Sequence, residues 1–309
     1  MLKKKLLKKI FLILSSLFIL FILYLFPTKD SNKIIKESKE TIPQTSIYLI
    51  DSRNYVSRVN VAITKKDKEE KIREIINYLT INSPNSSYIK EGFSPIIPKN
   101  TKILSIDIDD NLAKLNFSKE FYNITPELEE KMLSAIIYSV TGVEGIDKIS
   151  IYVEDSLLVE LPHSKQSLPP TLDRTFGINK IYDLTSIKGT TSTTIYYLSK
   201  YKDYYYYVPV TMISNSKKDK IEIIIEELTS KTMYQTNLIS YLNDARQISY
   251  EINDEYMLIR LNGELYHDLM QSNLIESVVY SINLSIKDNY NIKSVMYMVD
   301  EIIINSYFI

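Results

Sequence analysis

Several residue types that carry common protein chemistry are absent or scarce in this sequence. The 309-residue chain has no cysteine and no tryptophan, and it contains only two histidines and six glycines. Without cysteine there is no disulfide, thiolate metal site, cysteine nucleophile or lipid-modified cysteine. Six glycines leave little material for a glycine-rich phosphate loop. These absences exclude several kinds of site before any motif is considered.

The sequence also lacks an excess of basic charge. It carries 37 Lys and Arg against 38 Asp and Glu, a formal net charge of −1. Because nucleic-acid-binding domains usually show a basic excess, we expect no nucleic-acid partner. The densest basic cluster lies at the extreme N-terminus and consists of Lys3, Lys4, Lys5, Lys8 and Lys9. The content of 45% hydrophobic and 24% charged residues is typical of a globular protein.

A membrane anchor is the best interpretation of the N-terminus. Residues 10–26 are apolar except for Ser15, Ser16 and Tyr24. As a helix this stretch is about 26 Å long, close to the roughly 30 Å of a hydrocarbon core. The lysines before it place residues 1–9 in the cytoplasm. We therefore predict a cytoplasmic basic segment at 1–9, a single-pass transmembrane signal-anchor at 10–26 in the cell membrane, and an extracytoplasmic remainder.

A cleaved signal peptide is the alternative interpretation of the same stretch. Cleavage requires small residues after the apolar run. The first alanine of the chain is Ala62, and residues 23–26 are bulky, which favours an uncleaved anchor. Residues 27–44 are polar and rich in Lys, Glu and Ser, so we expect a tether between the membrane and the first domain.

The rest of the sequence repeats itself. Five stretches match in order, at an offset that drifts only from about 148 to 142 residues: 47–49 with 195–198, 71–80 with 220–229, 102–122 with 246–266, 136–140 with 278–282, and Tyr152 and Asp155 with Tyr297 and Asp300. Such self-similarity indicates duplicated structural units. We predict a first domain at 45–160, a connector at 161–192 and a second domain at 193–309.

Each copy is expected to be an α+β domain with the element order β-β-α-β-β-α-β. In the first copy the hydrophobic periodicity predicts strands at 46–50, 55–63, 103–109, 112–117 and 149–153, and helices at 66–80 and 127–141. One helix-covered antiparallel or mixed sheet per copy fits this order. The connector contains the apolar residues Phe176, Ile178, Ile181, Tyr182 and Leu184, so we expect it to pack on a domain.

The first copy resembles a known family. Residues 97–106, IPKNTKILSI, are similar to the "IPxGTKLLSV" strand entry of GerMN domains, and residues 111–121, NLAKLNFSKEF, are similar to their "VATVDFSKEF" segment. The resemblance covers 46–158, and the second copy matches more weakly. It implies a non-enzymatic scaffold in an envelope assembly outside the membrane, in sporulation or spore germination. Envelope proteins and further copies of the chain are then the expected partners. Many relatives are lipoproteins, and here the anchor helix would replace the lipid.

Few residues suggest chemistry. His163 lies between Pro162 and Ser164 in the connector, and His267 follows Tyr266 near an expected helix start. No grouping with a nucleophile and an acid is marked around either, so an exposed loop histidine is the better interpretation. The cluster Asp107, Asp109 and Asp110 lacks the glycine and the closing glutamate of an EF-hand loop, so turn carboxylates are the better interpretation. Glu120, in Ser118-Lys119-Glu120, and its counterpart Glu264 are expected to be structural. The sequence predicts no catalytic, cofactor-binding or metal-binding residue, and hence no enzyme and no cofactor.

An aromatic run at Tyr201 and Tyr204–Tyr207 leaves two interpretations open. Tyrosine favours strands, so alternating tyrosines on an edge strand are one account. The other is a stacking surface for wall sugars. The alternative function is accordingly a peptidoglycan-binding or peptide-binding module of the cell envelope. An envelope hydrolase with paired carboxylates is a third and weaker hypothesis.

Overall fold

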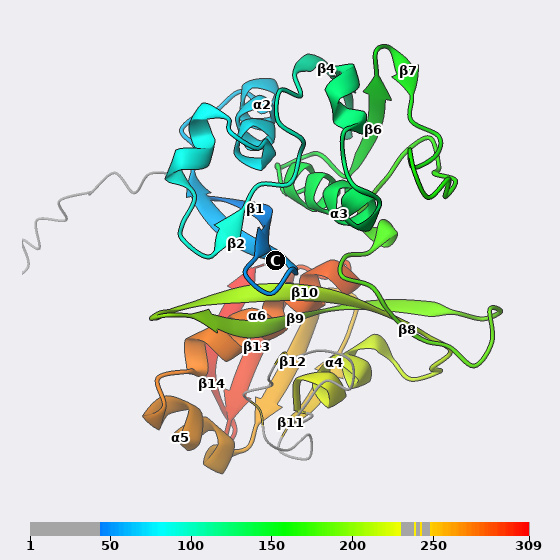
Figure 1. Ribbon diagram of the computed structural model, residues 1–309. Helices are drawn as coiled ribbons and strands as arrows, with labels where there is room; N and C mark the ends of the chain where they lie inside the picture. The colour runs from blue at the N-terminus through cyan, green and yellow to red at the C-terminus, as the bar shows by residue number, and fades with distance from the viewer. Residues whose placement is uncertain (1–43, 230–237, 239–241, 243–247, 309) are drawn as a thin grey trace, which may run out of the picture. The chain divides into compact units, whose positions relative to one another are not determined.

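The computed structural model describes residues 44–229, 238, 242 and 248–308. The predicted anchor at 10–26 and all of the tether except Gln44 lie outside the described residues. Within the described part of the chain, no helix combines the length and the hydrophobicity needed to cross a membrane. Residues 43–309 form one compact unit, and Figure 1 shows its elements.

All seven elements predicted for the first copy are present. The strands are β1 (Gln44–Asp51), β2 (Val56–Ala62), β4 (Ile103–Asp109), β5 (Leu112–Phe117) and β6 (Lys148–Val153), and the helices are α2 (Lys68–Leu79) and α3 (Glu129–Val140). Short additions are β3 (Phe93–Ser94), β7 (Ser156–Leu157) and the 3₁₀ helices η1 (Pro84–Tyr88), η2 (Lys119–Tyr122) and η3 (Pro126–Leu128). Asp67 caps the N-terminus of helix α2, because its carboxylate accepts a hydrogen bond from the Glu70 N–H.

The second copy repeats this order. Its strands are β9 (Thr191–Tyr201), β10 (Tyr204–Ser214), β11 (Ile248–Ile252), β12 (Tyr256–Leu261), β13 (Ser294–Val299) and β14 (Ile302–Phe308). Its helices are α4 (Lys220–Thr229), α5 (Gly263–Gln271) and α6 (Ile275–Asn289). Helix α5 stands where the first copy has only the single turn η2, and β14 extends the two-residue β7 into a full strand. The hydrophobic periodicity of the sequence predicted neither element.

The prediction of one sheet per copy was wrong. Each copy has a mixed four-stranded sheet, in the order β4-β5-β6-β7 or β11-β12-β13-β14. In each copy the first hairpin stays outside that sheet. The two hairpins, β1-β2 and β9-β10, join one another in a third sheet with β3 and β8 (Ile181–Asp183). The side-chain pattern of a strand fixes which face is buried but not which strand pairs with it, so this exchange is invisible in the sequence.

The β4-β5 and β11-β12 hairpins confirm the repeat at this place in the fold. Ile106 pairs with Leu115, and at an offset of 144 residues Tyr250 pairs with Ile259. The next strand pairs in parallel in both copies, Phe117 with Val153 and Leu261 with Val299. The connection to a parallel strand requires a crossover, and α3 and α6 provide it.

Two of the matched stretches need correction. Ser139 of α3 binds the β1 backbone, and the same position on α6 is held by Ser285, four residues beyond the Ser281 that the sequence match selects. A shift of four residues is one helical turn and preserves the apolar face, so the pattern cannot distinguish the two alignments. The strand registers likewise make Tyr297 the equivalent of Ile151 in the first copy, not of Tyr152. Tyr297 and Ile151 are both buried.

The connector is part of the packed structure. Leu172 forms a β-bridge with Ile149, and Leu161, Leu168 and Ile178 are buried. Of its other apolar residues, Phe176 and Ile181 are partly buried against the core, whereas Tyr182 is 55% and Leu184 37% exposed. The connector also contains the 3₁₀ helix η4 (Arg174–Phe176).

Candidate interaction site at the junction of the two repeats

The two repeats meet where β2 and β10 pair antiparallel, Arg58 opposite Tyr207. Tyr48 pairs with Arg58 in the first hairpin, and its counterpart Tyr196 pairs with Pro209 in the second. Arg58 and Pro209 are therefore equivalent positions. Equivalent strands that pair antiparallel are related by a local two-fold axis, as in a symmetric dimer. The junction thus resembles an interface between two copies of one subunit.

A side chain from the connector completes this strand pair. Pro209 has no backbone N–H and cannot continue the ladder. Instead, the Asn179 side-chain amide donates to the carbonyl oxygens of Val56 (2.8 Å) and Pro209 (2.7 Å). The Val56 N–H in turn donates to Asn179 Oδ1 (2.9 Å). Asn179 adopts a φ of 45°, which asparagine tolerates better than most residues.

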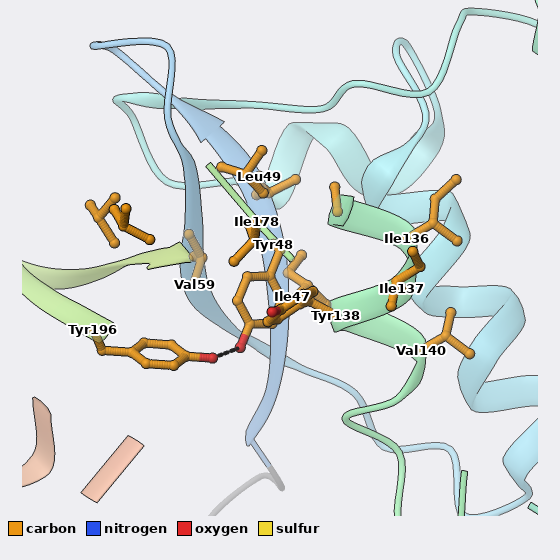
Figure 2. Packing of buried hydrophobic residues seen from close by; sticks show 14 of the residues in the cluster. Ile47, Tyr48, Leu49, Val59, Ile136, Ile137, Tyr138, Val140, Ile178 and Tyr196 are labelled. Carbon is orange, nitrogen blue, oxygen red and sulfur yellow. Dashed lines mark hydrogen bonds between the residues drawn. The ribbon is translucent and has the colours of Figure 1, made fainter. Parts of the chain in front are cut away.

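The two equivalent tyrosines bind each other across the junction. Figure 2 shows the hydrogen bond between the hydroxyls of Tyr48 and Tyr196 as a dashed line. Their oxygens lie 2.9 Å apart, and Tyr196 Oη donates to Asp288 Oδ2 at 2.7 Å. Because each hydroxyl has one proton, Tyr48 is the donor to Tyr196. Asp288 also forms an ion pair with Arg174 of the connector. A chain of hydrogen bonds therefore joins the first repeat, the second repeat and the connector.

Arg174 binds the C-terminal end of α3. Its Nε donates to Thr141 Oγ1 (3.1 Å), its Nη2 donates to the Tyr138 carbonyl (3.2 Å), and the guanidinium lies 4.9 Å from the centre of the Tyr138 ring. A cation at this end also complements the helix dipole. Tyr138 Oη returns a hydrogen bond to the Arg174 carbonyl (3.1 Å).

The electrostatics of this cluster follow from its burial. Tyr48 and Tyr196 are 2% and 0% exposed, and the Asp288 side chain is 3% exposed. Burial raises the pKa of Tyr48, and burial together with Asp288 raises the pKa of Tyr196 well above its ordinary value. Burial lowers the pKa of Arg174, but Asp288 together with the three neighbouring tyrosines outweighs burial, so the net direction is upward. The tyrosines stay neutral and the arginine stays charged at physiological pH.

Asp51 organises a second polar cluster at the junction. Its Oδ1 accepts the backbone N–H groups of Arg53 and Tyr55, both at 2.9 Å, which closes the β1-β2 turn. Its Oδ2 accepts from Tyr206 Oη of the second repeat at 2.9 Å. Arg53 donates to Ser199 and to Tyr206 across the same boundary. The turn of one repeat is thus bonded to the strands of the other.

Part of the tyrosine run belongs to this junction. Tyr201 lies on β9, which among the described strands pairs only with β10 and is an edge strand, as expected. Strand β10 pairs with β9 along its length and is not an edge strand, because on its other side Tyr207 pairs with Arg58 of β2 and residues 212–214 pair with β8. The Tyr206 ring packs edge-on against Phe93 (4.9 Å), and the Tyr207 ring lies 5.2 Å from that of Tyr280. Burial raises the pKa of Tyr207 to about 12. These rings contact protein, and of the five tyrosines in the run only Tyr205 is exposed, at 39%.

A cleft of about 740 Å³ opens beside these contacts and is lined by both repeats. Tyr48, Arg58 and Arg174 contribute to its wall, together with Tyr280 and Asp288 of α6. Arg58 Nη2 donates to Tyr280 Oη at 2.9 Å and lies over the Tyr280 ring. This volume is within the range of small-molecule and peptide sites.

The two histidines have separate structural roles. His163 Nε2 lies 2.7 Å from the Ile124 carbonyl oxygen, and its backbone N–H binds the carboxylate of Glu129. Glu129 is only 1% exposed and also accepts the Ser164 N–H, so it fixes the connector turn. His267 lies on α5, where its ring contacts Gln271 at 2.8 Å.

The carboxylates that the sequence singled out lie at turns and strand ends. Lys114 bridges Asp107 (3.4 Å) and Asp109 (3.3 Å) on the exposed side of the β4-β5 hairpin, and Asp110 holds the turn with a φ of 52°. In the described part of the chain, no three His, Asp or Glu side chains are grouped so that they could hold a metal ion.

Glu120 and Glu264 occupy equivalent places directly after β5 and β12. Ser118 precedes η2 and lowers the pKa of Glu120 by hydrogen bonding to it. Asn262 caps α5 and accepts the N–H groups of Glu264 (2.7 Å) and Leu265 (3.3 Å). Both acids start a helical turn, where a negative charge is favourable.

The junction residues that sequence reasoning missed are Arg174, Asn179 and Asp288. Arg174 and Asn179 lie in the connector and have no counterpart in a duplicated pattern, so the repeat gave no signal for them. Asp288 lies near the end of a helix whose register is ambiguous by one turn. The sequence repeat did point to Tyr48 and Tyr196, because they occupy matching positions in the first matched stretch of the two copies.

Comparisons with known proteins agree with this architecture. Residues 46–159 match the Germane family model, described as sporulation and spore germination. The chain is similar to the spore germination protein GerM of Bacillus subtilis, with 29% identity over 256 residues, which cover 81% of this chain and 69% of that protein. The solved structure of the tandem GerMN domains of the sporulation protein GerM from Bacillus subtilis matches with a TM-score of 0.72 and 26% identity, covering 84% of this chain and 91% of that one. The first repeat therefore matches the Germane family, and the chain is similar over most of its length to a protein with two GerMN domains in tandem.

Proposed function

We propose that the chain is a non-enzymatic scaffold of sporulation or spore germination, anchored in the cell membrane by residues 10–26 with both GerMN domains outside. The observation that supports this proposal best is the similarity of most of this chain to the spore germination protein GerM and to the structure of its tandem GerMN domains. The polar junction supports a scaffold role, because it holds both repeats in one compact unit. A rigid pair of domains presents two surfaces to envelope partners at a fixed separation.

Cysteine labelling tests the proposed topology, and the cysteine-free sequence makes the experiment direct. Single cysteines replace Lys5 before the apolar segment and Lys188, which is exposed in the connector. In intact cells a membrane-impermeant thiol reagent should label Lys188→Cys and leave Lys5→Cys unlabelled until the membrane is permeabilised. Alkaline extraction should leave the chain in the membrane fraction.

The matched control replaces three leucines of the 10–26 stretch by lysine, which a bilayer core disfavours. This variant should appear in the soluble fraction. Labelling of Lys5→Cys in intact cells, or release of the unmodified chain by alkaline extraction, would contradict the anchor.

The non-enzymatic role is tested with purified full-length chain in detergent. We expect no turnover of peptidoglycan, peptide or ester substrates above the rate of a denatured sample. Turnover that copurifies with the chain and disappears on replacing a single carboxylate, such as Glu120→Gln, would refute the scaffold proposal.

A further inference from the structure

The cleft at the junction has two walls of opposite charge. On the side of the second repeat, Lys220 begins α4 and Lys287 lies on α6. On the side of the first repeat and connector, three carboxylates, Glu144, Asp147 and Asp173, outnumber the single arginine Arg58. Arg174 and Asp288 lie between the walls and neutralise each other. A ligand with a single kind of charge would be repelled by one wall, whereas a ligand with both charges suits the two.

Neither lysine of the basic wall forms an ion pair with another described residue, whereas other lysines, such as Lys202 and Lys218, do. Lys220 is partly buried, and burial lowers its pKa. An anionic group bound beside Lys220 would favour the charged form of the lysine and so raise its pKa again.

We infer that the cleft is a binding site for a short peptide that carries both a carboxylate and an amine. The carboxylate lies against Lys220 and Lys287, and the amine faces Glu144 and Asp147. The rings of Tyr280 and Tyr307 supply apolar contact. A nucleic acid or another polyanion is disfavoured by the acidic wall. The inference concerns the cleft alone and does not depend on the membrane anchor.

Selection from a random heptapeptide library displayed on phage tests this inference. The target is the full-length chain in detergent, and detergent micelles without protein are the background. We expect enriched sequences to combine Asp or Glu with Lys or Arg. A synthetic copy of the most enriched peptide should bind the chain, and its Kd should rise at least tenfold in Lys220→Met and in Lys287→Met. Lys217→Met, at an exposed lysine outside the cleft, should bind like the unchanged chain.

A charge reversal keeps the test independent of folding effects at the partly buried Lys220. Lys287 is exposed, so Lys287→Glu should fold and should shift the selection towards peptides without an acidic residue. No enrichment over empty micelles would overturn the inference. The same holds for enrichment of uncharged or purely acidic peptides, and for binding that both methionine variants leave unchanged.

Discussion

The hydroxyl of Tyr196 links the two repeats, since it accepts from Tyr48 and donates to Asp288. Tyr196→Phe removes both bonds inside the protein while keeping the ring. We expect the free energy of unfolding to fall by about 1–3 kcal/mol, because one lost bond has a charged acceptor. Tyr48→Phe should cost about 1 kcal/mol, and the double variant should cost less than the sum of the two. Denaturant unfolding measures these values.

The control for these variants is Tyr88→Phe, at a side chain that is 76% exposed. It should change the stability by less than about 0.5 kcal/mol. Strictly additive effects of Tyr48→Phe and Tyr196→Phe would show that the two hydroxyls do not interact.

Buried phenols also set the response of the protein to alkaline pH. Burial raises the pKa of Tyr48, Tyr196 and Tyr297 above the ordinary value of 10.0. Above that pH the unfolded chain loses these protons while the folded chain keeps them, so the unfolded state gains stability as pH rises. The contribution is therefore complete below pH 10 and is lost at higher pH. The phenolate absorbance of these residues should appear only together with unfolding, and their titration at an ordinary pKa in folded protein would disprove this.

At the scale of elements, serines on two helices protect the outer edges of the paired hairpins. Ser139 Oγ of α3 accepts the Tyr48 N–H, and Ser285 Oγ of α6 accepts the Tyr196 N–H, both at 2.9 Å. Ser139→Ala and Ser285→Ala should each cost about 1–2 kcal/mol, because a buried N–H loses its partner. Hydrogen exchange should accelerate at Tyr48 in the first variant and at Tyr196 in the second.

Ser134→Ala is the matched control within α3. Ser134 is buried, but its hydroxyl bonds only to the Lys131 carbonyl of its own helix. Its replacement should leave exchange at Tyr48 unchanged. Slower or equal exchange at Tyr48 in Ser139→Ala would contradict the proposed protection of the strand edge.

Periodicity predicted the elements well because each has one buried face. Helix α2 buries Ile72, Ile75, Ile76 and Leu79, the residues that predicted it. The β4-β5 hairpin was predicted for the same reason, from its alternation and its turn. Helix α5 was missed because the first copy offers only η2 at that place, so the duplicated pattern gave no template for it.

Pairing between distant strands could not be predicted from the same signals. The tyrosines of β10 suit any strand, and nothing in their pattern distinguishes an edge from a position between β9 and β2. The candidate site depends on Arg174, Asn179 and Asp288, which are single polar residues outside the apolar pattern. Their roles follow only once the two hairpins are placed side by side.

On the scale of the whole molecule, the junction predicts that the two repeats unfold together. The third sheet contains strands of both repeats, and the clusters around Asp51 and Asp288 bond across it. Loss of either repeat would leave the buried polar groups of the other without partners, at a cost of about 1–3 kcal/mol for each group. The two domains should therefore behave as one cooperative unit.

Equilibrium unfolding with one fluorescent reporter in each repeat measures this cooperativity most directly. Because the chain has no tryptophan, Tyr88→Trp reports on the first repeat and Tyr256→Trp on the second, both at exposed positions. In full-length chain in detergent, urea should unfold both reporters at the same midpoint and with the same slope. Two separated midpoints, with one repeat still folded after the other has unfolded, would contradict the account of a single cooperative unit built from two repeats.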